Sequence, residues 1–113
     1  MSNTTRLIVH LEVKPKGAEM TLKGIEALLR DPEQLQEPDI AEVFDILIEE
    51  NSIEFTTTQR EGYADKNASD IAKFLGTKFP YKITSFSADE ITTENVFCID
   101  DKEEFNDWMD DAD

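Results

Sequence analysis

The spacing of apolar residues changes along the chain, and this change restricts the fold more than any other feature. In residues 5–13 every second side chain is apolar, which is the period of a strand with one buried face. In residues 38–50 the apolar side chains recur at intervals of three and four, which is the period of a helix with one buried face. A chain of 113 residues that uses both periods is predicted to form one α+β domain.

The same patterns, together with turn and capping residues, predict the other elements. Helices are expected over residues 22–30, from Asn67 or Ser69 to near Gly76, and after a capping box that begins at Asp101. Strands are expected over residues 53–58, 81–86 and 95–99, with a loop over 60–66 and an acidic connection over 87–94.

The predicted order of elements is therefore β-α-α-β-α-β-β-α. It describes about four mostly antiparallel strands packed against three to four helices, in a single domain that spans residues 1–113. Residues 110–113 are expected to form a frayed acidic C-terminus.

The chain is strongly acidic, and the acid is unevenly distributed. It has 26 acidic and 11 basic residues, for a net charge of −15. Residues 31–54 contain nine acids and no base, and residues 89–113 contain eleven acids and one lysine. Residues 1–30 and 55–88 each contain five bases and three acids. Because both acidic segments also have the apolar spacing of a helix, we interpret them as two surfaces of the folded domain.

The predicted helix over residues 38–50 would carry its acids on one stripe opposite its apolar side. At a rise of about 1.5 Å per residue this stripe has one charge per ~3.3 Å, close to the ~3.4 Å between phosphates along a DNA strand. Ile46 would project from the middle of the stripe, either covered by another segment or serving as the anchor of a charged interface. The partner-binding residues expected in this segment are Asp39, Glu42, Asp45, Ile46, Glu49 and Glu50.

A second acidic surface is expected on the C-terminal helix. Phe105, Trp108 and Met109 form an apolar stripe on this helix, which we expect to dock on the body of the domain. The alternative is a mobile helix that offers Trp108 to a partner. The partner-binding residues expected in this segment are Asp100, Asp101, Glu103, Glu104 and Asp107.

The chain lacks a recognisable set of catalytic or metal-binding residues. His10 is the only histidine and lies in a predicted strand, outside any motif. Cys98 is the only cysteine, which excludes an intramolecular disulfide, and its apolar neighbours predict a buried and inert thiol. The acidic segments lack the central glycine of an EF-hand. We therefore expect a protein that is not an enzyme and has no cofactor and no metal.

The charge also restricts the class of partner. Binding to nucleic acid or to an anionic membrane requires basic side chains, so neither is expected. Residues 1–14 lack the uninterrupted apolar stretch of a secretory signal, and no apolar stretch approaches the ~20 residues that span a bilayer, which predicts a cytoplasmic protein. The expected partner is a basic protein surface, such as the nucleic-acid-binding cleft of a nuclease or CRISPR effector.

In size and charge the chain resembles the small acidic DNA-mimic proteins that phages use for anti-restriction and anti-CRISPR defence. The resemblance is to a class defined by composition, without a shared sequence motif. It implies inhibition, in which the acidic surface occupies a cleft that normally binds nucleic acid. Two alternatives remain: an immunity protein or antitoxin against a basic toxin, and a structural or interaction domain whose acidity only confers solubility.

Overall fold

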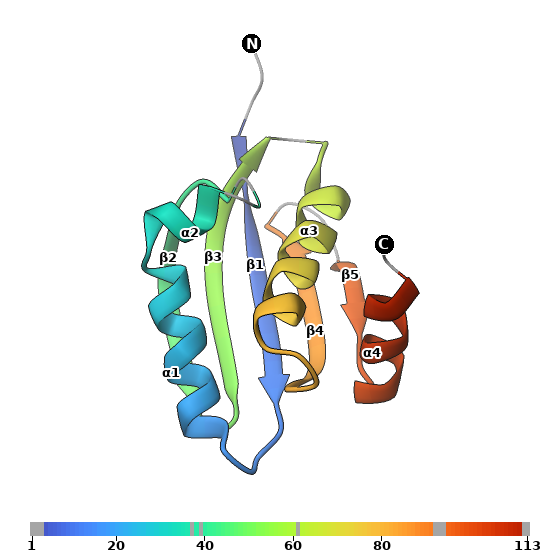
Figure 1. Ribbon diagram of the computed structural model, residues 1–113. Helices are drawn as coiled ribbons and strands as arrows, with labels where there is room; N and C mark the ends of the chain where they lie inside the picture. Colours follow the sequence, from blue (N-terminus) through green and yellow to red (C-terminus); the bar gives the residue numbers. More distant parts are fainter. Residues whose placement is uncertain (1–3, 37, 39, 61, 92–94, 112–113) are drawn as a thin grey trace.

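The computed structural model describes residues 4–36, 38, 40–60, 62–91 and 95–111, and it contains one antiparallel sheet of five strands (Figure 1). The strands lie side by side in the order β2-β3-β1-β4-β5. Their bounds are β1 (Thr4–Val13), β2 (Val43–Glu49), β3 (Ser52–Arg60), β4 (Ile83–Glu90) and β5 (Asn95–Ile99). The predicted α+β class and its largely antiparallel sheet are confirmed, with one strand more than expected.

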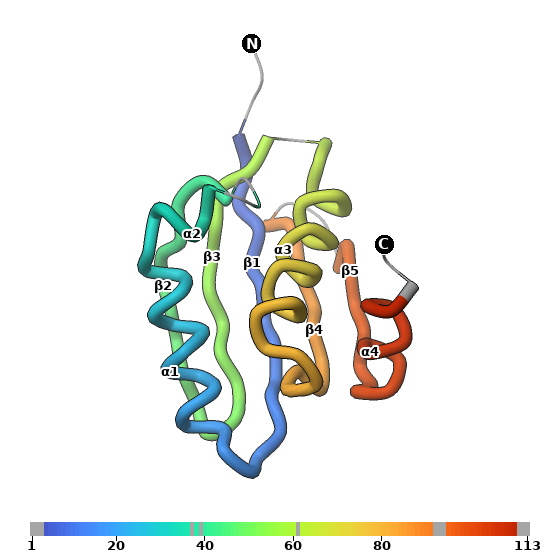
Figure 2. Tube along the Cα trace, in the orientation of Figure 1, coloured from blue at the N-terminus to red at the C-terminus, as the bar shows by residue number. Residues whose placement is uncertain are grey.

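The larger helices pack against one face of the sheet. The helices are α1 (Ala18–Leu29), α2 (Pro32–Gln36), α3 (Ala64–Lys78) and α4 (Lys102–Asp111). Figure 2 shows α1 and α3 in front of the strands, with α4 beside β5. Strands β1 to β4 with α1 and α3 have the connectivity of two interlocked split β-α-β units, the ferredoxin-like arrangement, to which β5 and α4 are added.

Strand β1 has the alternation predicted for it. Leu7, Val9, Leu11 and Val13 are fully buried beneath the helices, at the centre of the core. Side chains that are directly paired across antiparallel strands lie on the same side of the sheet, so the register defines an opposite face, which we call the open face. Its residues are Thr4, Arg6, Ile8, His10, Glu12, Phe44, Leu47, Glu49, Ser52, Glu54, Thr56, Thr58, Arg60, Ser85, Ser87, Asp89, Asn95 and Cys98.

The predicted helix over residues 38–50 is wrong, because residues 43–49 form strand β2 at one edge of the sheet. The register explains the error. Phe44 pairs with Thr56 and Leu47 pairs with Glu54, so two residues of β2 lie opposite one residue of β3. This bulge, at which Asp45 has a φ of +53°, adds one residue to the alternation. The apolar side chains consequently recur at three and four, as they would in a helix.

The remaining boundaries differ from the predicted ones by a few residues. Helix α3 begins at Ala64, and Asn67 does not cap it but donates from Nδ2 to the side-chain oxygen of Gln59 at 3.0 Å. Helix α1 begins at Ala18, four residues before the expected start. Strand β4 continues to Glu90, through part of the segment that was predicted to be a connection. Pairing between strands fixes this boundary, and the local sequence does not reveal it.

Helix α4 confirms the predicted cap and the predicted docking. The Oδ1 atom of Asp101 accepts hydrogen bonds from the backbone N–H groups of Glu103, at 2.7 Å, and Glu104, at 3.4 Å. Phe105 is buried, and the ring centroid of Trp108 lies 5.8 Å from that of Phe105. The helix extends to Asp111, so residues 110 and 111 are helical, and residues 112 and 113 lie outside the described residues.

Gly76 provides the space on α3 into which α4 packs. A Cβ atom at this position would lie 2.8 Å from the sulfur of Met109 and 3.1 Å from the ring of Phe105. We expect Gly76→Val to destabilise the domain by about 1–3 kcal/mol, because its branched side chain must displace both neighbours.

Gly76→Ala is the matched comparison, and a smaller loss is expected from it because the end of the Met109 side chain can move. The test combines denaturant unfolding with the emission of Trp108, the single tryptophan, which should shift to longer wavelength when α4 separates from the domain. Unchanged emission and stability in Gly76→Val would contradict this packing.

Candidate partner-binding surface

The first acidic segment forms the β2 edge of the sheet and the turns at either end of this strand. Glu42, Asp45, Glu49 and Glu50 are exposed, and none has an ion pair or side-chain hydrogen bond to another described residue. Asp39 lies outside the described residues. The four acids do not form the predicted helical stripe, because side chains of a strand alternate between its two sides.

Ile46 does not project from the middle of an acidic stripe. It is half-buried and packs against the hydrophobic core, because the bulge at residues 45 and 46 brings it opposite Phe55 of β3. The exposed apolar residues of this strand are instead Leu47, which is 53% exposed on the open face, and Ile48, which is 39% exposed on the helical side. Helical spacing predicted a buried Leu47 and an Ile46 on the acidic side, and the bulge reverses the positions of these two residues.

The second acidic segment lies at the opposite edge of the sheet, after β5 and on α4. Its five predicted residues are exposed: Asp100, Asp101, Glu103, Glu104 and Asp107. Two of these carboxylates have partners, since Asp101 caps α4 and Asp100 accepts a hydrogen bond from the thiol of Cys98 at 3.0 Å. The other three have no ion pair or side-chain hydrogen bond to a described residue.

The strand order separates the two acidic segments. Strands β2 and β5 are at opposite ends of the sheet, four interstrand spacings apart, which amounts to about 19 Å at ~4.8 Å per spacing. The structure therefore does not bring all the predicted residues into one patch. It places two groups of carboxylates at opposite edges of one sheet.

The open face contributes carboxylates that sequence reasoning did not select. Glu49 of β2 and Glu12 of β1 both pair with Ser52 of β3, and Glu54 lies two residues along the same strand. These three acids form the open-face triad, with no ion pair or side-chain hydrogen bond to another described residue. Alternation along β1 and β3 already placed Glu12 and Glu54 on polar faces. Only the pairing register shows that they adjoin Glu49.

The lysines lie elsewhere in the molecule. In the described structure all eight lie outside the five strands, in helices or connecting segments. Lys23 and Lys66 pair with carboxylates one helical turn away, Glu19 at 3.1 Å and Asp70 at 2.9 Å. The helical side thus has its acids partly neutralised by neighbouring bases, whereas the carboxylates of β2 and the open face are not paired in this way.

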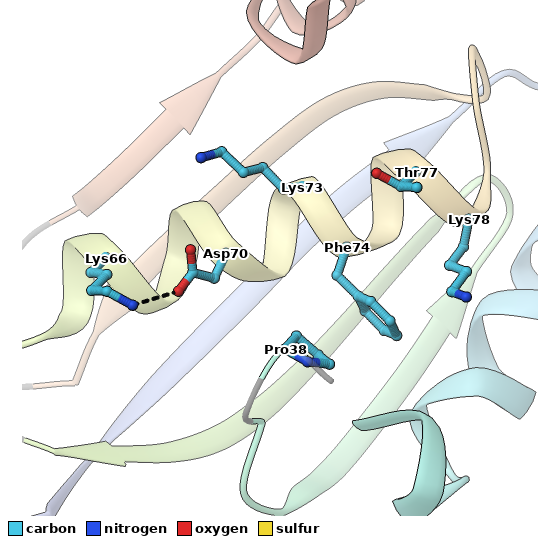
Figure 3. Close-up of a pocket in the computed structure, with 7 residues that line it drawn as sticks. All are labelled: Pro38, Lys66, Asp70, Lys73, Phe74, Thr77 and Lys78. Carbon is cyan, nitrogen blue, oxygen red and sulfur yellow. Dashed lines mark hydrogen bonds and ion pairs between the residues drawn. The ribbon is translucent and has the colours of Figure 1, made fainter. Parts of the chain in front are cut away.

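A pocket lies along α3, on the helical side (Figure 3). It is a shallow hollow of about 480 Å³ lined by Pro38, Lys66, Asp70, Lys73, Phe74, Thr77 and Lys78. Phe74 points toward Pro38, and the Nζ atom of Lys78 lies 5.8 Å from the centre of the Phe74 ring. Lys66 and Lys78 are twelve residues apart on one helix, which separates their backbones by about 18 Å. The ammonium groups of these two residues therefore do not converge on a single small anion.

Cys98 is exposed, which corrects the prediction of a buried thiol. The reason is that β5 is an edge strand and alternation places Cys98 on the open face, while its neighbour Ile99 is buried in the core. The pKa of the thiol is raised, chiefly by its hydrogen bond to the Asp100 carboxylate, then by burial and by the charges of Asp100, Glu104 and Asp89.

The raised pKa predicts that the Cys98 thiol reacts slowly with alkylating agents. Only the thiolate reacts with alkylating agents, so raising the pKa lowers the reactive fraction at any pH below it. Asp100→Asn should lower the pKa and accelerate alkylation of Cys98 by iodoacetamide at pH 8 several-fold. The rate is followed by mass spectrometry, with Glu19→Gln, on the exposed side of α1, as the control. Equal rates for Asp100→Asn and the unmodified protein would contradict the assigned hydrogen bond.

His10 lies on the open face, between Glu54 of β3 and Ser87 of β4 in one row of the sheet. Among the described residues, no group of three or more histidine, cysteine, aspartate or glutamate side chains is arranged to hold a metal ion. The exposed carboxylates of the two edges and the open face can instead attract a basic partner through their charge.

In the part of the chain that the structure describes, none of the helices has the length and apolar character needed to cross a membrane. Comparison with protein-family models, with curated proteins and with solved structures finds no match to this chain.

Proposed function

We propose that this protein is an acidic inhibitory binding protein, which mimics the charge of nucleic acid and occupies the nucleic-acid-binding cleft of a basic enzyme. One observation carries the proposal. Carboxylates without basic partners among the described residues lie at both edges and on the open face of the sheet, whereas the lysines lie outside the strands. The chemical class of target is a nuclease, restriction enzyme or CRISPR effector, as for a phage anti-restriction or anti-CRISPR protein.

The geometry supports mimicry by charge and exposure more than by close imitation of a phosphate backbone. Side chains on one face of a strand recur every ~6.7 Å, about twice the ~3.4 Å between phosphates along a DNA strand. Unpaired carboxylates steer a basic partner during encounter and lose no internal ion pair when it binds. The same proposal places the protein in the cytoplasm, where such enzymes act, without direct contact to nucleic acid or membrane.

The test begins with the immobilised protein and a host-cell lysate, at about 50 mM salt for binding and about 500 mM for elution. The captured enzyme is then purified, and its affinity for labelled duplex DNA or RNA is measured at increasing concentrations of this protein. The expected result is competition, in which the apparent dissociation constant for nucleic acid rises in proportion to the inhibitor concentration.

Other results would contradict the proposal. A captured toxin without affinity for nucleic acid would favour the immunity-protein alternative. If no partner is eluted by salt and nucleic-acid binding is unaffected, the acidity serves solubility alone.

A further inference from the structure

The open face carries a band of apolar side chains beside its acids. Phe44, Thr56 and Ile8 form one row across β2, β3 and β1, and Leu47 follows Phe44 on β2 after the bulge. Thr56 is buried, and we call the three apolar residues, Ile8, Phe44 and Leu47, the apolar band. Figure 1 shows α1 and α3 over one face of the sheet, and the buried side chains of β1 lie on that face, so these two helices do not cover the band, which lies on the open face.

The apolar band is partly accessible to a partner. Leu47 is 53% exposed, and Ile8 and Phe44 are half-buried, although each lies in a strand of a well-packed sheet. The guanidinium of Arg6 lies 5.4 Å from the centre of the Phe44 ring and shields one side of it. Contiguous exposed apolar patches, unlike single exposed apolar residues, mark interaction surfaces.

The charge next to the apolar band is negative on one side. The open-face triad, Glu12, Glu49 and Glu54, lies toward the turn between β2 and β3, and Glu54 pairs directly with Leu47. An apolar centre bordered by unpaired charges is the usual arrangement of an interface, in which the centre supplies affinity and the border supplies attraction and orientation.

We infer that the apolar band is the anchor site for the basic partner, and that the partner presents an apolar side chain flanked by lysine or arginine. The inference rests on the proposed function, because it names the part of the basic partner that is recognised. A second copy of this chain is a poor occupant, since the bases that the register places on its open face, Arg6 and Arg60, already lie over the rings of Phe44 and Tyr63. Nucleic acid is excluded by repulsion from the open-face triad.

Two synthetic helical peptides of about 15 residues, with equal numbers of lysines, serve as probes. One has leucine at the positions between its lysines, and the other has alanine. Binding is measured by titration into the isotopically labelled protein, with backbone amide and methyl signals recorded by NMR. The leucine peptide should bind at least about ten-fold more tightly and should shift the signals of Ile8, Phe44 and Leu47.

Two matched double variants locate the contact. Phe44→Ala with Leu47→Ala should weaken binding of the leucine peptide by about ten-fold and leave binding of the alanine peptide nearly unchanged. Met20→Ala with Tyr81→Ala removes two exposed side chains away from the open face, at 81% and 63% exposure, and should change neither. Leu47→Ala alone is used if the first double variant loses its dispersed amide spectrum.

The inference is overturned if the two peptides bind equally, if neither binds, or if the leucine peptide shifts signals of α3 or α4 instead. These outcomes do not decide the proposed function, which depends on competition with nucleic acid at the target enzyme. Conversely, an enzyme that is not inhibited leaves the peptide contacts measurable, so the two failures can be told apart.

Discussion

Replacing Phe86 with alanine is expected to lower the free energy of unfolding by about 3–5 kcal/mol, a large part of the 5–15 kcal/mol typical of a domain. Phe86 is fully buried on β4. Its ring centroid lies 5.7 Å from that of Phe97 on β5 and 6.4 Å from that of Phe105 on α4. One side chain therefore joins the last strand and the last helix to the sheet, and its removal leaves a cavity where these elements meet.

The measurement is denaturant unfolding followed by circular dichroism and by the emission of Trp108. Trp108 contacts the same aromatic cluster, with a ring-centroid distance of 5.3 Å to Phe97, so its emission should change together with the stability. Met20→Ala is the control, because Met20 is 81% exposed on α1 and its loss should cost less than about 0.5 kcal/mol. A loss below about 1 kcal/mol for Phe86→Ala would contradict the proposed position of the ring.

The second large effect is expected on binding. Glu42→Lys, Asp45→Asn and Glu49→Lys together raise the net charge from −15 to −10 and remove the negative charge of the β2 edge. Asparagine is chosen at position 45 because the residue has a φ of +53°, which asparagine tolerates well. Affinity for the captured target enzyme should fall by about 100-fold at low salt, because opposing bases lose their partners and two new positive charges face them.

A matched variant separates the position of the charge from its amount. Glu19→Lys, Glu26→Lys and Asp70→Asn also raise the net charge to −10, but they lie on α1 and α3. Calorimetry or surface plasmon resonance at several salt concentrations should show only a small change in affinity for the target enzyme with this set of substitutions. Equal losses of affinity for both variants would mean that the net charge of the protein decides binding. An unchanged affinity of the β2 variant would mean that the β2 edge is not part of the interface.

The sequence predicts those elements whose side chains follow a single period. Strand β1 is such a case, because Leu7, Val9, Leu11 and Val13 alternate without interruption and are all buried. Helix α4 is another, because Asp101 signals its start locally. Strand β2 fails because its bulge changes the period, and a bulge is recognised only when the partner strand is known.

The candidate surface could be predicted only in part, for a related reason. Exposure of the acids follows from their charge, and Glu42, Glu49 and Glu104 are exposed as expected. Their mutual positions depend on strand order and register, which the sequence does not contain in readable form. The open-face triad and the apolar band result from the pairing of β1 and β2 with β3, and the exposure of Leu47 in place of Ile46 results from the bulge in β2.

The bulged β2 strand also bears on whether copies of the protein can join edge to edge into fibres. An edge strand offers unpaired backbone groups on which another chain can add a strand, and proteins counter this with bulges and charges. In this protein a bulge interrupts the edge at Asp45, and Glu49 carries a further charge on the same strand. At physiological salt the screening length of ~8 Å exceeds the ~4.8 Å between strands, so the repulsion between two such edges persists. At 1 M salt the screening length falls to ~3 Å, shorter than the distance between strands, so charge repulsion between two β2 edges is largely lost. In concentrated protein at this salt, the bulge is then the remaining feature of β2 that opposes edge-to-edge addition of strands.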